Sequence, residues 1–199
     1  MSENEQIIKK IRIKIIVVVV VLLFCSSAYA DDNTAKILLG KVKDFYMWAL
    51  VNHDKVSALG PRIRNVEGST RFYLDMKTLD EFSHEFMKSG LFSKQFPDAI
   101  ARHYKKYEAQ FSALPQSEFD EMAKDGRGPM MDVEDMDIFF CAQEYDYDPK
   151  FIQGMRISEL SEKSEVTSVI VESPYKWKTR FNFTREDGQW LIVGYCVYQ

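Results

Sequence analysis

The sequence has few of the residues on which common catalytic and nucleic-acid-binding motifs depend. It contains three histidines, three cysteines and nine glycines in 199 residues. The glycines form no phosphate-binding loop, and no Ser-His-Asp or Cys-His signature is present. Basic residues are also scarce, because residues 31–199 carry 22 of them against 28 acidic residues, a formal charge of −6. This acidic balance gives no support for binding to a phosphate backbone, so we expect no nucleic-acid partner.

The first thirty residues differ in composition from the rest of the chain. A basic stretch, KKIRIK, precedes an apolar run from Ile15 to Phe24, and small residues follow up to Ala28 and Ala30. This order predicts a secretory signal peptide over residues 1–30, cleaved between Ala30 and Asp31. We therefore expect one mature domain over residues 31–199 in the periplasm or another extracytoplasmic space.

Two other functions of the leader are weaker interpretations. A membrane anchor needs about 20 apolar residues, and the apolar run is roughly half that length. A lipoprotein signal needs a small residue before its cysteine, whereas Phe24 precedes Cys25. We therefore expect contact with a membrane only through the signal peptide before cleavage.

Removal of the leader leaves two cysteines, Cys141 and Cys196. In an oxidising compartment they are candidates for a disulfide. The disulfide would close a loop of about 55 residues, and its stabilisation would be on the order of 3–4 kcal/mol. Two buried thiols are an equally good interpretation, because cysteine is among the most frequently buried residue types.

The N-terminal half of the mature chain has helical periodicity. Apolar residues recur at three- and four-residue spacings, and glycine or proline follows each helical stretch. The sequence predicts helices over residues 34–57, 76–90 and 97–114, with a shorter helical piece over 117–124.

The C-terminal part changes to the period of β-strands. Four segments rich in β-branched and aromatic residues predict an antiparallel meander: residues 154–161, 165–173, 176–184 and 189–198. In the third segment, Trp177, Thr179, Phe181 and Phe183 alternate with polar residues and predict one apolar face. The last segment is apolar on both faces, so we expect it at the centre of the sheet.

Helices followed by a strongly twisted antiparallel sheet predict an α+β fold, with the N-terminal helices on the concave face. This outline resembles the nuclear transport factor two-like, or cystatin-like cone, superfamily. The closest resemblance within it is to a family of small bacterial envelope proteins and lipoproteins of uncharacterised function. Four stretches carry this resemblance: DFYMWAL, RFYLDMKTLDEF, DVEDMDIFFCAQEYD and GQWLIVGY. The resemblance implies a cone-like binding module and supplies no catalytic residues.

The densest polar feature is an acidic segment with interleaved tyrosines. Its members are Asp132, Glu134, Asp135, Asp137, Glu144, Tyr145, Asp146, Tyr147 and Asp148. Calcium coordination is one interpretation, but the spacing lacks the glycine and glutamate of a helix–loop–helix calcium site. We therefore expect no metal. An anionic edge that binds a basic protein partner is the second interpretation, and a solvated acidic loop is the third.

The three histidines indicate no catalytic site. His84 lies one helical turn after Asp80, which would suit acid–base chemistry, but such pairs are common on helix surfaces. His53 and His103 have no partner that the sequence identifies. We therefore expect neither an enzyme nor a cofactor.

Two functions from different classes follow. The first is an exported, non-enzymatic protein that binds a protein partner, such as an immunity or inhibitor protein against an envelope-targeting toxin or hydrolase. The alternative is binding or turnover of a small apolar molecule in the cavity of the cone.

Overall fold

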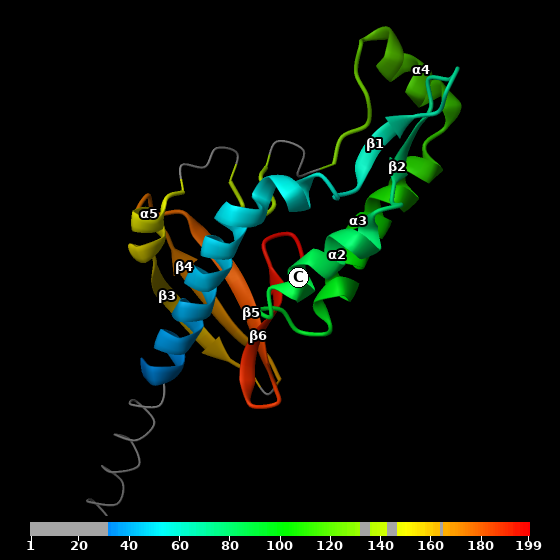
Figure 1. Ribbon diagram of the computed structural model, residues 1–199. Coiled ribbons are helices and arrows are strands. Elements are labelled where there is room, and N and C mark those ends of the chain that lie inside the picture. The colour runs from blue at the N-terminus through cyan, green and yellow to red at the C-terminus, as the bar shows by residue number, and fades with distance from the viewer. Residues whose placement is uncertain (1–31, 132–135, 143–146, 164) are drawn as a thin grey trace, which may run out of the picture. The chain divides into compact units, whose positions relative to one another are not determined.

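The computed structural model describes residues 32–131, 136–142, 147–163 and 165–199 (Figure 1). The chain separates into two compact units, residues 1–37 and 38–199. In the first unit, residues 32–37 are helical. The second unit continues with helical residues 38–57 and contains all the other elements. These are β1 (Arg62–Asn65), β2 (Phe72–Asp75), α2 (Leu79–Lys88), α3 (Phe96–Ala113), α4 (Gln116–Lys124), α5 (Pro149–Gln153), β3 (Arg156–Glu162), β4 (Thr167–Glu172), β5 (Lys178–Glu186) and β6 (Gln189–Tyr195).

The order of these elements confirms the predicted α+β fold. Helices come first, and the last four strands form one antiparallel sheet in the order β3-β4-β5-β6. β4 and β6 lie within the segments predicted for them, and β3 and β5 overlap theirs but end one and two residues later than predicted. The long helices also begin and end within a few residues of the predicted positions, where Gly90 at φ +69° follows α2 and Pro115 follows α3.

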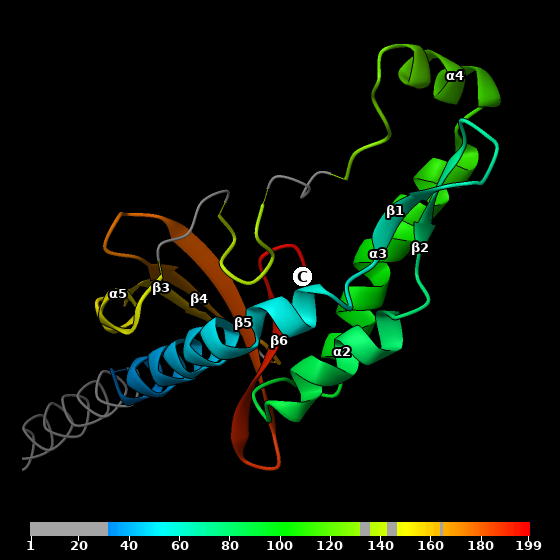
Figure 2. The same cartoon turned by 45° about the horizontal axis from the view of Figure 1, so that its top comes forward.

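Aromatic side chains hold the helices against the sheet. Residues 38–57 lie across one face of the sheet, as Figures 1 and 2 show from two directions. Phe45 of this helix is buried 4.7 Å from Tyr195 and 6.1 Å from Phe181, measured between ring centroids. Phe92 and Phe96 continue the same core toward α2 and α3. Burial of each such ring contributes roughly 1.5–3 kcal/mol, so this core fixes the second unit.

The last strand is not central, which corrects the sequence prediction. β6 pairs with β5 alone among the named strands and forms the edge of the sheet. The segment before α3 covers this edge, because Ser93 N–H donates to Ile192 O at 2.8 Å and Ile192 N–H donates to Leu91 O at 2.9 Å. β6 therefore has the apolar composition of a buried strand without a strand on each side.

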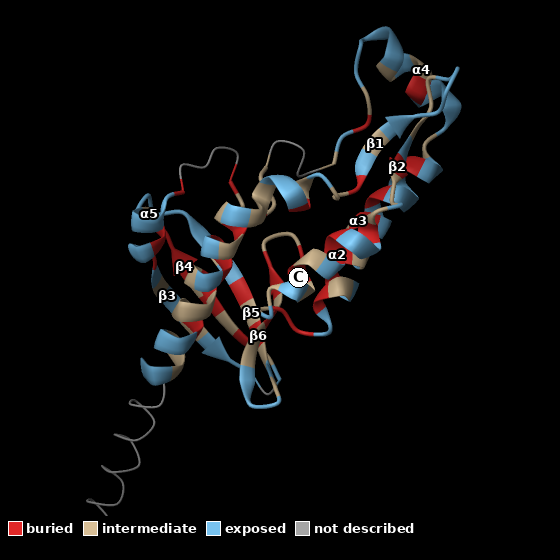
Figure 3. Ribbon diagram, viewed as in Figure 1, coloured by how far each residue is buried: buried red, intermediate tan, exposed pale blue. Residues whose placement is uncertain are grey.

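The strand prediction was also wrong for Trp177, which lies before β5 and is 46% exposed, whereas Phe181 and Phe183 are buried as predicted. The hairpin of β1 and β2, whose strands have four residues each, was not predicted. α4 packs on this hairpin, since the rings of Phe72 and Phe119 lie 6.3 Å apart. Figure 3 shows buried positions along α3 beside the hairpin.

Among the described residues, no helix has the length and apolar character needed to cross a bilayer. The predicted cleavage site at Ala28, Ala30 and Asp31 lies outside the described residues.

Candidate functional site

The structure describes three of the nine residues predicted to contact a partner. Asp137, Tyr147 and Asp148 are described, and the other six lie outside the described residues: Asp132, Glu134, Asp135, Glu144, Tyr145 and Asp146. The three described side chains all make contacts within the protein. They show how the middle and the C-terminal end of the acidic segment are held.

Asp137 closes a tight turn in the middle of the acidic segment. Its Oδ1 accepts hydrogen bonds from the backbone N–H groups of Phe139 and Phe140, both at 2.9 Å. Its own N–H donates to Ala142 O, and Cys141 N–H donates to its carbonyl oxygen, both at 2.8 Å. The Asp137 carboxylate therefore has a structural function, because it satisfies backbone donors that the fold buries.

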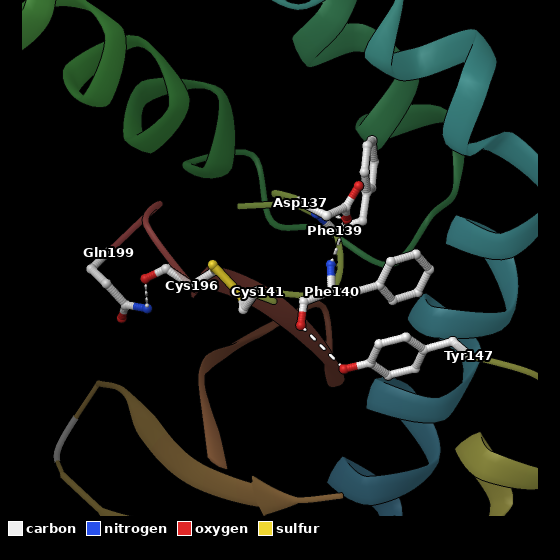
Figure 4. Close-up of a disulfide and its surroundings, with 7 residues drawn as sticks. All are labelled: Asp137, Phe139, Phe140, Cys141, Tyr147, Cys196 and Gln199. Carbon is white, nitrogen blue, oxygen red and sulfur yellow. Dashed lines mark hydrogen bonds between the residues drawn. A yellow bond between two sulfur atoms is a disulfide. The ribbon is translucent and has the colours of Figure 1, made fainter. Parts of the chain in front are cut away.

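A cysteine pair joins this turn to the C-terminus (Figure 4). The Sγ atoms of Cys141 and Cys196 lie at disulfide distance, 2.16 Å, and their Cα atoms are 5.8 Å apart. Of the two interpretations of these cysteines, the structure therefore favours the disulfide over separate buried thiols. The C-terminal residues turn back on β6, because Tyr195 and Tyr198 exchange backbone hydrogen bonds of 2.8 and 2.9 Å. The turn is thus attached to the buried end of the sheet.

Tyr147 and Asp148 fix the C-terminal end of the acidic segment. The Tyr147 ring stacks on Phe140 at 4.3 Å and on Tyr46 at 5.5 Å. Its hydroxyl donates to Phe140 O at 3.2 Å, and burial, with a smaller effect of the Asp137 charge, raises the pKa of Tyr147 to about 12. Asp148 caps α5 by accepting from Phe151 N–H at 2.6 Å. Tyr147 is therefore a core residue and Asp148 a helix cap.

The His53 side chain contacts the acidic segment, and this contact was not predicted from the sequence. Its Nε2 lies 2.5 Å from Asp137 Oδ2 and its Nδ1 lies 2.9 Å from Asp54 Oδ1. Burial lowers the pKa of His53, but the hydrogen bonds and negative charges of the two aspartates outweigh burial, so the net shift is upward. Because both ring nitrogens contact carboxylates, we interpret His53 as an anchor of the turn. A separation of 84 residues from Asp137 left no signal in the sequence.

The other histidines have different surroundings. No hydrogen bond or ion pair joins Asp80 to His84, both of which belong to the part of the chain that the structure describes. His103 lies among the rings of Tyr104, Tyr107 and Tyr198, with centroids 5.0, 5.2 and 5.3 Å away. Within the described ranges, no group of three or more His, Cys, Asp or Glu side chains is arranged to hold a metal ion.

One surface cavity of about 340 Å³ bears on the alternative function. It lies where the turn between β3 and β4 meets β5, β6 and the start of α3. Polar or charged residues supply four of its six lining positions: Gln95, Glu165, Val166, Thr184, Arg185 and Val193. A lining of this kind gives no support for a small apolar ligand, which needs a mostly apolar wall.

Comparison with known proteins adds no relative. No family model, curated protein or solved structure matches this chain. Membership of the cone superfamily therefore stays a prediction from the residues quoted above.

Proposed function

We propose that this chain is an exported, non-enzymatic protein that binds a basic protein partner through its acidic segment, residues 132–148. The observation that carries the proposal is the closed turn between Asp137 and Ala142. These two residues form an antiparallel bridge, so the chain enters and leaves the turn at neighbouring points. The disulfide and the Asp137 hydrogen bonds hold both points on the core.

This arrangement supports an electrostatic contact. The runs 132–135 and 143–146 contain three and two carboxylates, and they join the two sides of the same turn. Because they start from a fixed base, less conformational entropy is lost when a partner binds. Complementary charge also speeds the encounter with a basic partner and selects its orientation. The three described residues contribute by holding this base rather than by presenting their own charges.

The concrete form that we propose is an inhibitor or immunity protein for a basic, envelope-targeting toxin or hydrolase. A small, acidic, disulfide-containing chain with a secretory leader suits this function. Export is tested by the intact mass of the protein purified from its natural compartment. We expect a chain that begins at Asp31, and a retained leader would contradict export.

Binding is tested by pull-down from envelope extract with residues 31–199 as bait, followed by affinity measurement with the purified partner. The test variant is Asp132→Asn/Asp135→Asn/Asp146→Asn, which leaves Asp137 in place. At about 0.5 kcal/mol for each charge removed, we expect the affinity to fall about tenfold and its salt dependence to flatten.

The matched control removes the same number of exposed charges elsewhere, in Glu67→Gln/Glu118→Gln/Glu121→Gln. We expect the control to bind like the wild type. Equal affinities for all three proteins, or equal losses in both variants, would contradict the acidic segment as the contact surface.

A further inference from the structure

Two exposed aromatic side chains lie together on the turn between β4 and β5. Tyr175 is 62% exposed and Trp177 is 46% exposed, and their ring centroids are 6.3 Å apart. Phe151 of α5 lies 5.1 Å from Tyr175 and 4.7 Å from the buried Tyr147. A chain of rings therefore runs from the core to the surface through Tyr147, Phe151, Tyr175 and Trp177. We call Phe151, Tyr175 and Trp177 the aromatic patch.

The turn that presents the aromatic patch is held by its own hydrogen bonds. Ser173 N–H donates to Trp177 O at 2.9 Å, and Trp177 N–H donates to Ser173 Oγ at 3.2 Å. Lys176 N–H donates to Ser173 O at 2.9 Å, with Lys176 in the left-handed region at φ +68°. The turn also packs closely on α5, because a Cβ at Gly154 would come within 2.9 Å of Pro174 Cγ. The backbone that carries the two rings is therefore held by contacts within the protein.

Cations surround the aromatic patch in a chain that is acidic as a whole. Glu172 accepts from Arg156 at 2.6 Å and from Lys176 at 3.0 Å, and it is 10% exposed. The two cations are 64% and 71% exposed, so their remaining N–H groups face solvent. Lys178 pairs with Glu159 at 3.6 Å, and Lys150 is exposed beside Phe151. Four cations thus face three carboxylates around the rings, because the exposed Asp148 also lies beside Phe151, from whose N–H it accepts at 2.6 Å.

We propose that the aromatic patch is a second docking surface, which binds a partner protein through an apolar side chain flanked by acidic residues. Ordered tyrosine and tryptophan rings with arginine nearby have the composition of binding hot spots. Their cationic rim is complementary to acidic groups beside the anchor. The Tyr175 and Trp177 rings cross at 65° with centroids 6.3 Å apart, so an apolar side chain can pack against both rings on their exposed side. This surface adjoins the C-terminal end of the acidic segment at Tyr147 and Asp148, but it has the opposite charge preference.

The test uses the mature chain and two synthetic peptides, followed by two-dimensional amide NMR. The first peptide carries one phenylalanine between four glutamates, and its twin carries lysines in place of the glutamates. We expect the acidic peptide to bind at least about tenfold more tightly than its twin. Shifted signals should map to residues 150–156 and 173–178.

Variants distinguish specific binding at this surface from non-specific hydrophobic binding. We expect Tyr175→Ala/Trp177→Ala to lose binding of the acidic peptide at least tenfold. The matched control is Tyr73→Ala, which removes a 40% exposed tyrosine from β2 and should bind like the wild type. Because the replaced side chains are exposed, thermal unfolding should show that all variants fold.

Four outcomes would overturn the proposal. These are no binding of the acidic peptide at millimolar concentration, equal binding of the twin, an equal loss in Tyr73→Ala, and binding to anionic phosphatidylglycerol vesicles without peptide binding. The last would identify a lipid surface instead. None of them depends on residues 132–146, so they leave the proposed function to its own test.

Discussion

Replacement of Asp137 by alanine should be the most damaging single change in the acidic segment. The substitution removes the acceptor of the Phe139 and Phe140 N–H groups and the partner of His53 Nε2. Phe139 and Phe140 are 0% and 1% exposed, so water cannot replace the acceptor without opening the turn. Replacement by alanine should be tolerated at an aspartate that accepts no buried N–H group.

The magnitude follows from the contacts that are lost. A buried donor left without an acceptor costs about 1–3 kcal/mol, and a hydrogen bond between charged groups contributes about 1.5–3 kcal/mol. The Asp137 side chain is 13% exposed and that of His53 is 21% exposed, so solvent replaces only part of these contacts. We expect Asp137→Ala to lower the free energy of unfolding by about 3–5 kcal/mol, a large fraction of a domain's total.

The assay is equilibrium unfolding in urea without reductant, which leaves the cysteine pair unchanged. Asp137→Asn is the matched variant, because its amide oxygen still accepts from both backbone N–H groups, and it should lose about 1–2 kcal/mol. Asp54→Ala removes the exposed, solvent-screened partner of the same histidine and should lower the free energy of unfolding by less than about 1 kcal/mol. Equal stabilities of Asp137→Ala and Asp54→Ala would refute the structural function that we assign to Asp137.

Two further predictions concern the same turn. The contribution of His53 to the free energy of unfolding should be complete below pH 6.5 and lost as the pH rises through the pKa of the folded protein, because folding raises the pKa of His53. His53→Gln should therefore remove this fall above pH 6.5. Parallel plots of the free energy of unfolding against pH for the variant and the wild type would contradict this prediction. Cys141→Ser/Cys196→Ser should lower the free energy of unfolding by about 3–4 kcal/mol, and two titratable thiols in the unfolded, unreduced wild type would contradict the disulfide.

The regular elements could be predicted from the sequence where a hydrophobic periodicity extends over many residues. The helix predicted over residues 97–114 and the strand predicted around Phe181 have such patterns, and the structure confirms them as α3 and β5. Three features depend on contacts that no local pattern encodes. The hairpin of β1 and β2 has only four residues in each strand, and the position of β6 at the edge depends on Ser93 and Leu91 from a distant segment. Trp177 is exposed because the turn before β5 holds it away from the core.

The acidic segment shows most clearly what composition cannot separate. Nine residues were predicted as one contact surface, and the three described members all make contacts within the fold. Asp137 accepts buried N–H groups, Tyr147 stacks in the core, and Asp148 caps α5. A carboxylate that satisfies a backbone donor and one that faces a partner look identical in a sequence, because the difference lies in where the donor is. The proposed contact with a partner therefore depends on the five carboxylates of residues 132–135 and 143–146, and the described fold supplies the closed turn between Asp137 and Ala142 that joins these two runs.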